Sequence, residues 1–124
     1  MTQARQRLGK IGEDLACREL EQRGYAILDR RYRHQGAEID IVARDAGTLV
    51  FVEVKARDGP EFGGGAEAVA PRKQRRIVRA AMDYLVRRIG HECACRFDVV
   101  SVDLAPGGEP RIEVIRGAFD ASGQ

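Results

Sequence analysis

The sequence contains no tryptophan, and aromatic residues make up only 6% of its 124 positions. Proteins that bind single-stranded nucleic acid without base readout usually stack the bases on exposed aromatic rings, so this composition argues against such a platform. An excess of charge of one sign is also absent, because 21 Lys and Arg residues face 19 Asp and Glu residues, for a net charge of +2. Any electrostatic attraction must therefore come from where the charges lie.

Cysteine is scarce and odd in number, with Cys17, Cys93 and Cys95 only. This argues against a disulfide framework and for a reducing compartment. The first ten residues contain no apolar run, so we expect no signal peptide. A hydrophobic fraction of 44% beside 32% charged residues excludes a membrane-spanning chain. We therefore predict a cytoplasmic protein without a membrane partner, folded as one domain over residues 1–124.

Hydrophobic periodicity predicts two helices, one from Arg5 to Arg23 and one from Pro71 to about Ile89. The predicted strands are Tyr25–Tyr32, Ala37–Arg44, Thr48–Lys55, Cys95–Leu104 and Arg111–Arg116. A short turn signal at Asp45-Ala46-Gly47 favours an antiparallel hairpin between the second and third strands. The glycine-rich stretch from Asp58 to Gly65 predicts a mobile loop. The fold class is therefore α/β, a mixed sheet flanked by helices in the order helix, three strands, helix, two strands.

The first helix carries two distinct faces. One face consists mainly of small residues, which would let the helix approach a sheet closely, yet it includes a glutamate where a surface glutamate would not be placed. Its members are Gly9, Gly12, Glu13, Ala16 and Leu20. The neighbouring face, formed by Leu8, Ile11 and Leu15, is apolar without an evident partner and favours a homodimer.

The third predicted strand is apolar on both faces until its end, where Glu53 and Lys55 share one face about 7 Å apart. Such charges need each other or a metal if they are buried. A structural Glu–Lys pair is one interpretation. In the preceding strand, Asp40 would fall opposite the region from Phe51 to Glu53, which would bring two carboxylates within reach of one cation. Two carboxylates with waters suit Mg²⁺ or Mn²⁺, and Lys55 could then orient a water.

These residues also match a known pattern. Asp40, followed thirteen residues later by Glu53-Val54-Lys55, resembles the PD-(D/E)XK nuclease signature. Together with Gly12-Glu13 it is distantly similar to archaeal Holliday-junction resolvases. The segments GKIGEDLA, AEIDIVAR, LVFVEVKAR, PRKQRR and RFDVVSV resemble, in consistent order, the bacterial YraN-like family of predicted endonucleases. The proline of the signature's name is missing, because Ile39 precedes Asp40.

The resemblance implies a restriction-endonuclease-like core with Asp40, Glu53 and Lys55 as catalytic residues. It also implies Mg²⁺ or Mn²⁺ as cofactor, held by Asp40 and Glu53. Glu13 is carried over as a further metal ligand, direct or through water. Gln74 matches a glutamine of the second helix that lies near such sites, although its helical position is equally typical of a core hydrogen bond.

The second helix is strongly basic, with seven Lys or Arg residues against Asp83 alone. Arg72, Lys73, Arg75 and Arg76 crowd its first turns, where the helix dipole disfavours positive charge. A solvated basic face is one interpretation. We favour contacts with the phosphate backbone of a nucleic acid, because the N–H groups at a helix N-terminus also attract an anion.

The sequence therefore favours a metal-dependent endonuclease that hydrolyses phosphodiester bonds in structured or branched DNA. The alternative is a nucleic-acid-binding module that keeps this fold without cleaving. Retention of Asp40, Glu53 and Lys55 together favours the enzyme, because a binding module gains nothing from two carboxylates that repel one another.

Overall fold

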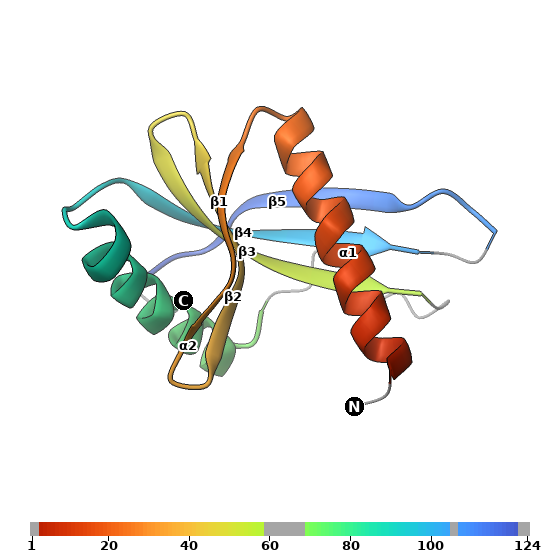
Figure 1. Cartoon of the computed structure of the whole chain (residues 1–124), viewed down its shortest axis with the longest axis horizontal. Coiled ribbons are helices and arrows are strands. Elements are labelled where there is room, and N and C mark those ends of the chain that lie inside the picture. Colours follow the sequence, from red (N-terminus) through yellow and green to blue (C-terminus); the bar gives the residue numbers. More distant parts are fainter. Residues whose placement is uncertain (1–2, 59–68, 105–106, 122–124) are drawn as a thin grey trace.

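Five strands form one mixed sheet, with a helix packed on each face (Figure 1). The computed structural model describes residues 3–58, 69–104 and 107–121. Its elements are α1 (Gln3–Gln22), β1 (Ala26–His34), β2 (Ala37–Asp45), β3 (Thr48–Arg57), α2 (Pro71–Tyr84), a π-helical turn (Leu85–Ile89), β4 (Cys95–Asp103) and β5 (Arg111–Phe119). The predicted order of elements is confirmed. Neither helix in the described residues is long and apolar enough to cross a lipid bilayer.

The strands lie in sequence order across the sheet. β1, β2 and β3 form two consecutive antiparallel hairpins, while β3 and β4 are parallel and connected through α2. β5 returns antiparallel to β4. The hairpin predicted at Asp45-Ala46-Gly47 is therefore present, with Asp45 paired to Thr48. The parallel pair places the N-terminus of α2 and the end of β3 near each other, which positions the site described below.

The alternating apolar residues of β3 contribute to two separate cores. Leu49 and Phe51 pack with Ile77 and Tyr84 beneath α2. Val50 and Val52 pack on the opposite face, against Ala16 and Leu20 of α1. A strand buried on both faces reads as a continuous apolar run, which is why this segment was identifiable from sequence.

Three local features differ from the sequence-based expectation or fall outside it. The second helix does not continue regularly to Ile89, because a π-helical turn follows Tyr84. Gly90 caps this turn with a φ of +82°, a value that favours glycine. The predicted loop from Asp58 to Gly65 lies, beyond Asp58 itself, outside the described residues. The apolar face of α1 is only partly covered, with Ile11 48% exposed, and the homodimer remains a prediction.

Close approach of α1 to the sheet depends on Gly12. A Cβ atom at this position would lie 2.5 Å from Cβ of Ala56, a side chain that cannot rotate away. At Gly9, one turn earlier in α1, a Cβ atom would have nothing within 4 Å. Gly12 is therefore required by packing against β3, whereas Gly9 is not.

The two glycines provide a matched test of this packing. Gly12→Ala should lower the free energy of unfolding by about 1–3 kcal/mol through overpacking. Gly9→Ala should leave it unchanged or raise it by up to about 1 kcal/mol, because alanine is the better helix former. Urea denaturation of both variants and the wild type measures the difference. Equal effects at the two positions would contradict the assigned contact.

Candidate functional site

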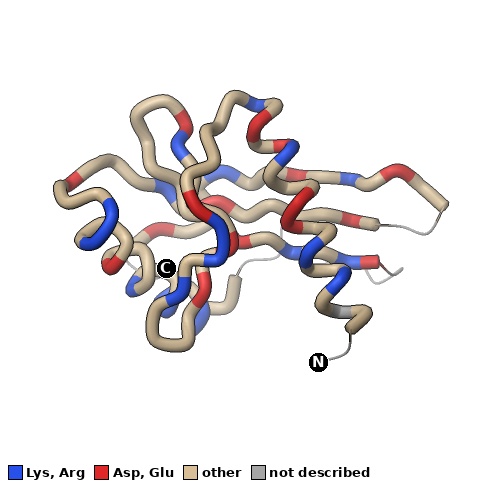
Figure 2. Tube along the Cα trace, viewed as in Figure 1, with Lys and Arg blue, Asp and Glu red and all other residues tan. Residues whose placement is uncertain are grey.

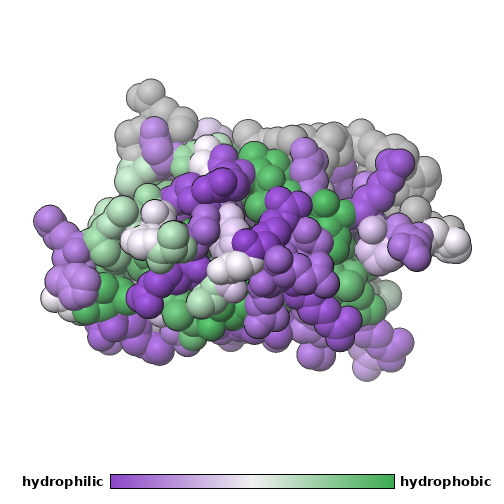
Figure 3. Space-filling view, turned by 90° about the horizontal axis from the view of Figure 1, so that it is seen from above, coloured by the Kyte–Doolittle hydropathy of each residue, from purple (hydrophilic) through white to green (hydrophobic). Residues whose placement is uncertain are grey.

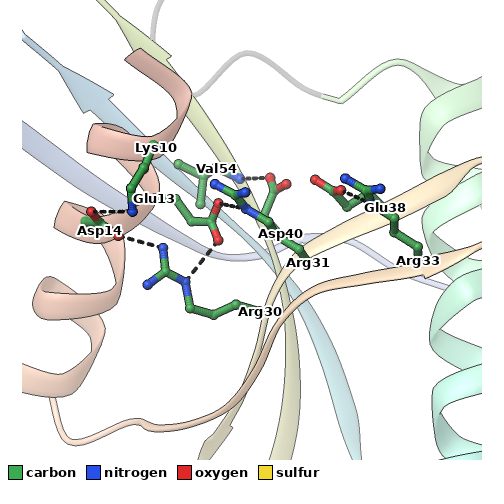
Figure 4. Close-up of polar contacts among 9 residues, drawn as sticks. All are labelled: Lys10, Glu13, Asp14, Arg30, Arg31, Arg33, Glu38, Asp40 and Val54. Atoms are coloured by element: carbon green, nitrogen blue, oxygen red, sulfur yellow. Dashed lines mark hydrogen bonds and ion pairs between the residues drawn. The ribbon is translucent and has the colours of Figure 1, made fainter. Parts of the chain in front are cut away.

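Asp40 and Glu53 lie at the point where the β2–β3 hairpin opens. The ladder between the strands runs from Asp45↔Thr48 to Ile41↔Val52, and one further step in the same register places Asp40 opposite Glu53. Directly after the last backbone pair, the Asp40 side chain provides the hydrogen-bond acceptor for β3. Its Oδ2 accepts a hydrogen bond from the N–H of Val54 at 2.7 Å (Figure 4). This bond fixes the Asp40 carboxylate at the end of β3.

The two carboxylates are held together in a poorly solvated place. Burial, and then the neighbouring charge of Glu53, raise the pKa of Asp40 to about 8, while the Val54 N–H opposes this shift. Glu53 is only 6% exposed. Its Oε2 forms an ion pair with Nζ of Lys73, in the first turn of α2. Lys73 therefore compensates one carboxylate of the pair, and Asp40 retains a strong tendency to bind a proton or another cation.

A pocket of about 420 Å³ opens beside this pair. It lies between the β1–β2 hairpin, the end of β3 and the N-terminus of α2. Charged residues of both signs line it, namely Glu38, Asp40, Glu53, Arg72, Lys73 and Arg76. Figure 2 shows the basic residues of α2 close to the acidic residues of the hairpin. The pocket can thus accept a cation on its carboxylate side and an anion on its α2 side.

The start of α2 adds backbone donors to the basic side chains. Ala70 precedes the helix without a side-chain capping hydrogen bond, and Pro71 occupies its first turn. The N–H of Gln74 makes the first intrahelical bond, to the carbonyl of Ala70 at 2.9 Å. The N–H groups of Arg72 and Lys73, which precede Gln74, thus lie at the helix end, where anions bind favourably.

Lys55 and Gln74 occupy different surroundings from each other. Lys55 lies two residues beyond Glu53, so strand alternation places both side chains on the same face of β3. Lys55 pairs in register with Ser101 of β4.

Gln74 is 6% exposed and points into the core, where Nε2 donates to the Val69 carbonyl at 2.7 Å. Its buried Oε1 has no hydrogen-bond partner within residues 3–58, 69–104 and 107–121. The core hydrogen bond, one of the two interpretations of Gln74, is present.

Glu13 does not join Asp40 and Glu53. Glu13 is 5% exposed, and its carboxylate accepts hydrogen bonds from Nε of Arg30 at 3.0 Å and from Nε of Arg31 at 2.9 Å (Figure 4). In the described part of the chain no group of three His, Cys, Asp or Glu side chains is arranged to hold a metal ion. Both oxygens of Glu13 are thus already engaged by arginines.

Three basic partners of the acidic residues were not predicted from the sequence. Lys73 was predicted only as a phosphate contact, and Arg30 and Arg31 were not singled out. The adjacent Arg30 and Arg31, in the strand before that of Asp40, are the feature of the sequence that could have indicated this cluster. No signal in the sequence connects Lys73 to Glu53, since a loop separates them.

The donor set of Asp40 and Glu53 fits a hard divalent cation. Both residues offer carboxylate oxygens, which Mg²⁺ and Mn²⁺ prefer, and a site of one or two carboxylates completed by water is typical of Mg²⁺. Burial, and then the charge of Glu53, raise the pKa of Asp40, and a bound cation would favour the ionised form of both carboxylates. The residues present therefore fit the predicted metal as a two-carboxylate site.

On the face shown in Figure 3, hydrophobic areas lie between hydrophilic side chains. Large apolar side chains that are exposed in the described residues are Ile11, Met82 and Val86. None of these three lines the pocket.

The sheet order, the two flanking helices and the carboxylates of Asp40 in β2 and Glu53 in β3 define a mixed α/β protein consistent with the restriction-endonuclease-like class. The chain belongs to the uncharacterised protein family UPF0102, whose model matches residues 12–102. This is the YraN-like family that the sequence motifs indicated.

Relatives in this family cover nearly the whole chain. A UPF0102 protein of Ralstonia pickettii is 51% identical over 115 residues, 90% of this chain and 88% of the relative. One of Anaeromyxobacter dehalogenans is 48% identical over 120 residues, covering 97% and 89%. The protein STH1475 of Symbiobacterium thermophilum is 46% identical over 115 residues, covering 93% and 98%.

The raised pKa of Asp40 gives a pH-dependent stability. Between its unfolded value of 3.8 and about 8, the folded protein holds a proton that the unfolded chain has lost, so this residue's contribution to the free energy of unfolding falls as pH rises. Asp40→Asn keeps an acceptor for the Val54 N–H and removes the titration. At pH 8 the variant should be more stable than the wild type by about 1–3 kcal/mol.

Urea denaturation of both proteins at several pH values from 5 to 9 tests this expectation. All buffers are free of divalent cations. The difference in stability should grow with pH and level off above about 8. A constant difference over this range would show that Asp40 has an ordinary pKa and that the two carboxylates do not interact.

Proposed function

We propose that this protein is a metal-dependent nuclease that hydrolyses phosphodiester bonds in DNA, with structured or branched DNA as its substrate. The observation that carries the proposal is the carboxylate pair of Asp40 and Glu53 in a pocket whose other side is basic. A phosphodiester group bridged to a divalent cation has the charge distribution that such a pocket accommodates. The resemblance to junction resolvases supports a branched substrate.

Each residue of the site has a role in this chemistry. Asp40 and Glu53 would hold Mg²⁺ or Mn²⁺, and the bound ion would supply Lewis-acid polarisation of the phosphate and a more acidic water. Lys55, on the same face as Glu53, would orient the attacking water or stabilise charge on a phosphate oxygen. Val54 donates its N–H to Asp40 and so keeps that carboxylate in position.

The α2 side of the pocket would hold the DNA backbone. Arg72 and Arg76 line the pocket and are exposed. Arg75 is exposed on the same turns. Lys73 is paired with Glu53, and a cation bound to Glu53 would release its ammonium group for a phosphate oxygen. Contacts of this kind position a nucleic acid without reading its sequence.

The Lys73–Glu53 ion pair also favours the alternative function. A carboxylate that already has a lysine as counter-ion is partly neutralised without a metal. A nucleic-acid-binding module with this fold could retain such a pair for stability alone. Cleavage assays separate the two functions, because only the nuclease requires both carboxylates and Lys55.

The purified protein should nick at least one structured DNA when Mg²⁺ or Mn²⁺ is present. Flap, four-way-junction, duplex and single-stranded DNA are compared by gel electrophoresis. Glu53→Gln and Lys55→Ala should each lose most of the activity, about 10²-fold or more, while still binding DNA, because affinity depends mainly on backbone cations.

Control reactions contain EDTA in place of metal. Activity that persists in both variants would come from a contaminating nuclease. Binding without cleavage of any substrate in either metal would favour the non-catalytic module over the enzyme.

The basic residues of α2 are tested by the salt dependence of DNA binding. Replacing Arg72 and Arg76 together by glutamine should weaken binding to all sequences and reduce the slope of log K against log salt by up to about two, one unit per lost phosphate contact. The matched control replaces Arg18 and Arg23, two exposed arginines in or just after α1. Equal slopes for the two double variants would assign the α2 residues to a solvated face.

A further inference from the structure

An ion-pair cluster around the buried Glu13 lies on the other side of Asp40 from the pocket. Glu13 of α1, 5% exposed, accepts from Arg30 and Arg31 with one oxygen each. Asp14 accepts from Nη2 of Arg30 at 2.7 Å and lies 3.7 Å from Nζ of Lys10. The cluster thus holds three cations and two carboxylates, and one positive charge is left over.

The backbone at Arg31 is unusual for a strand. Its φ of +57° lies in the left-handed region that side chains other than glycine rarely adopt. Neighbouring residues of a regular strand point to opposite faces, yet Arg30 and Arg31 both reach Glu13. The left-handed conformation is what brings the two side chains to the same partner.

Arg31 is also the residue of β1 that faces Asp40. Arg30 pairs with Ile41 and Tyr32 with Ile39, so Arg31 stands opposite Asp40 in register. Figure 4 shows its guanidinium between the carboxylates of Glu13 and Asp40. The side chain remains 48% exposed. Within the described residues only its Nε makes a hydrogen bond, so both Nη groups can donate to a further acceptor.

The two arginines differ in how fully they are neutralised. Arg30 donates to both Glu13 and Asp14, whereas Arg31 donates to Glu13 alone. Arg31 therefore keeps more unused hydrogen-bond donors than Arg30. A planar guanidinium with unused donors beside a metal-binding carboxylate suits a phosphate oxygen.

We infer that Arg31 binds a backbone phosphate of the DNA next to Asp40, and that Glu13 is a positioning residue that holds Arg31 there rather than a metal ligand. The inference rests on the proposed function. It places a second phosphate contact on the α1 side of the carboxylate pair, opposite Arg72 and Arg76 on the α2 side. Arg31 would then contact the DNA backbone on one side of the reacting phosphate, and Arg72 and Arg76 would contact it on the other.

The first test measures DNA binding in EDTA, so that cleavage plays no part. Arg31→Gln should reduce the slope of log K against log salt by about one. Arg30→Gln is the matched control, because it removes the same charge from the neighbouring residue and also breaks a contact with Glu13. Its slope should stay at the wild-type value. Arg31→Lys should restore the slope but not full cleavage, because an ammonium group lacks the planar donor geometry.

The second test measures metal affinity by titrating Mg²⁺ and Mn²⁺ in a calorimeter. Glu13→Gln should bind metal within about twofold of the wild type while cleaving structured DNA at least tenfold more slowly at saturating DNA. Asp40→Asn serves as the reference for a lost ligand. Circular dichroism verifies that each variant is folded, and Arg31→Gln tests the inference independently if Glu13→Gln does not fold.

The outcomes separate this inference from the proposed function. If Glu13→Gln loses metal affinity as Asp40→Asn does, Glu13 is a ligand and the inference is wrong. An unchanged salt slope for Arg31→Gln, in a protein that binds and cleaves DNA, would also overturn it while leaving the nuclease intact. A wild-type protein that neither binds nor cleaves DNA would overturn the proposed function and this inference together.

Discussion

Repulsion between Asp40 and Glu53 is the constraint around which the other polar contacts of this region are arranged. The hairpin register places the two carboxylates opposite each other where β2 and β3 separate, and burial raises the pKa of Asp40 to about 8. Such a pair weakens the folded protein unless other groups compensate it. The Val54 N–H and Lys73 supply part of that compensation, and a divalent cation would complete it.

The two helices that flank the pair contribute different charged groups to this region. α2 brings basic side chains and its N-terminus to the pocket, whereas α1 brings Glu13 and Asp14 to neutralise arginines of β1. Gly12 permits this approach of α1, because any side chain there would meet Ala56. One turn of α1 therefore contains both Gly12, which packs against β3, and Glu13, which forms the ion pairs with β1.

Much of the fold was predictable because its signals are local. The apolar run of β3 indicates a buried strand, the proline at the start of α2 suits a first helical turn, and Gly24 after α1 adopts the positive φ that ends a helix. The turn between β2 and β3 fixed the register and hence the juxtaposition of Asp40 with Glu53. The π-helical turn after Tyr84 was not predicted, because no residue type there signals it.

The sequence by itself determined the elements, their order and the identity of the acidic pair, since alternation and turn chemistry act between near neighbours. Only the tertiary structure decided which charges compensate which. Lys73 reaches Glu53 across the connection to α2, and Glu13 binds Arg30 and Arg31 because a left-handed residue turns both arginines toward α1. These pairings depend on how whole elements pack in space, a relation that residue spacing along the chain does not encode.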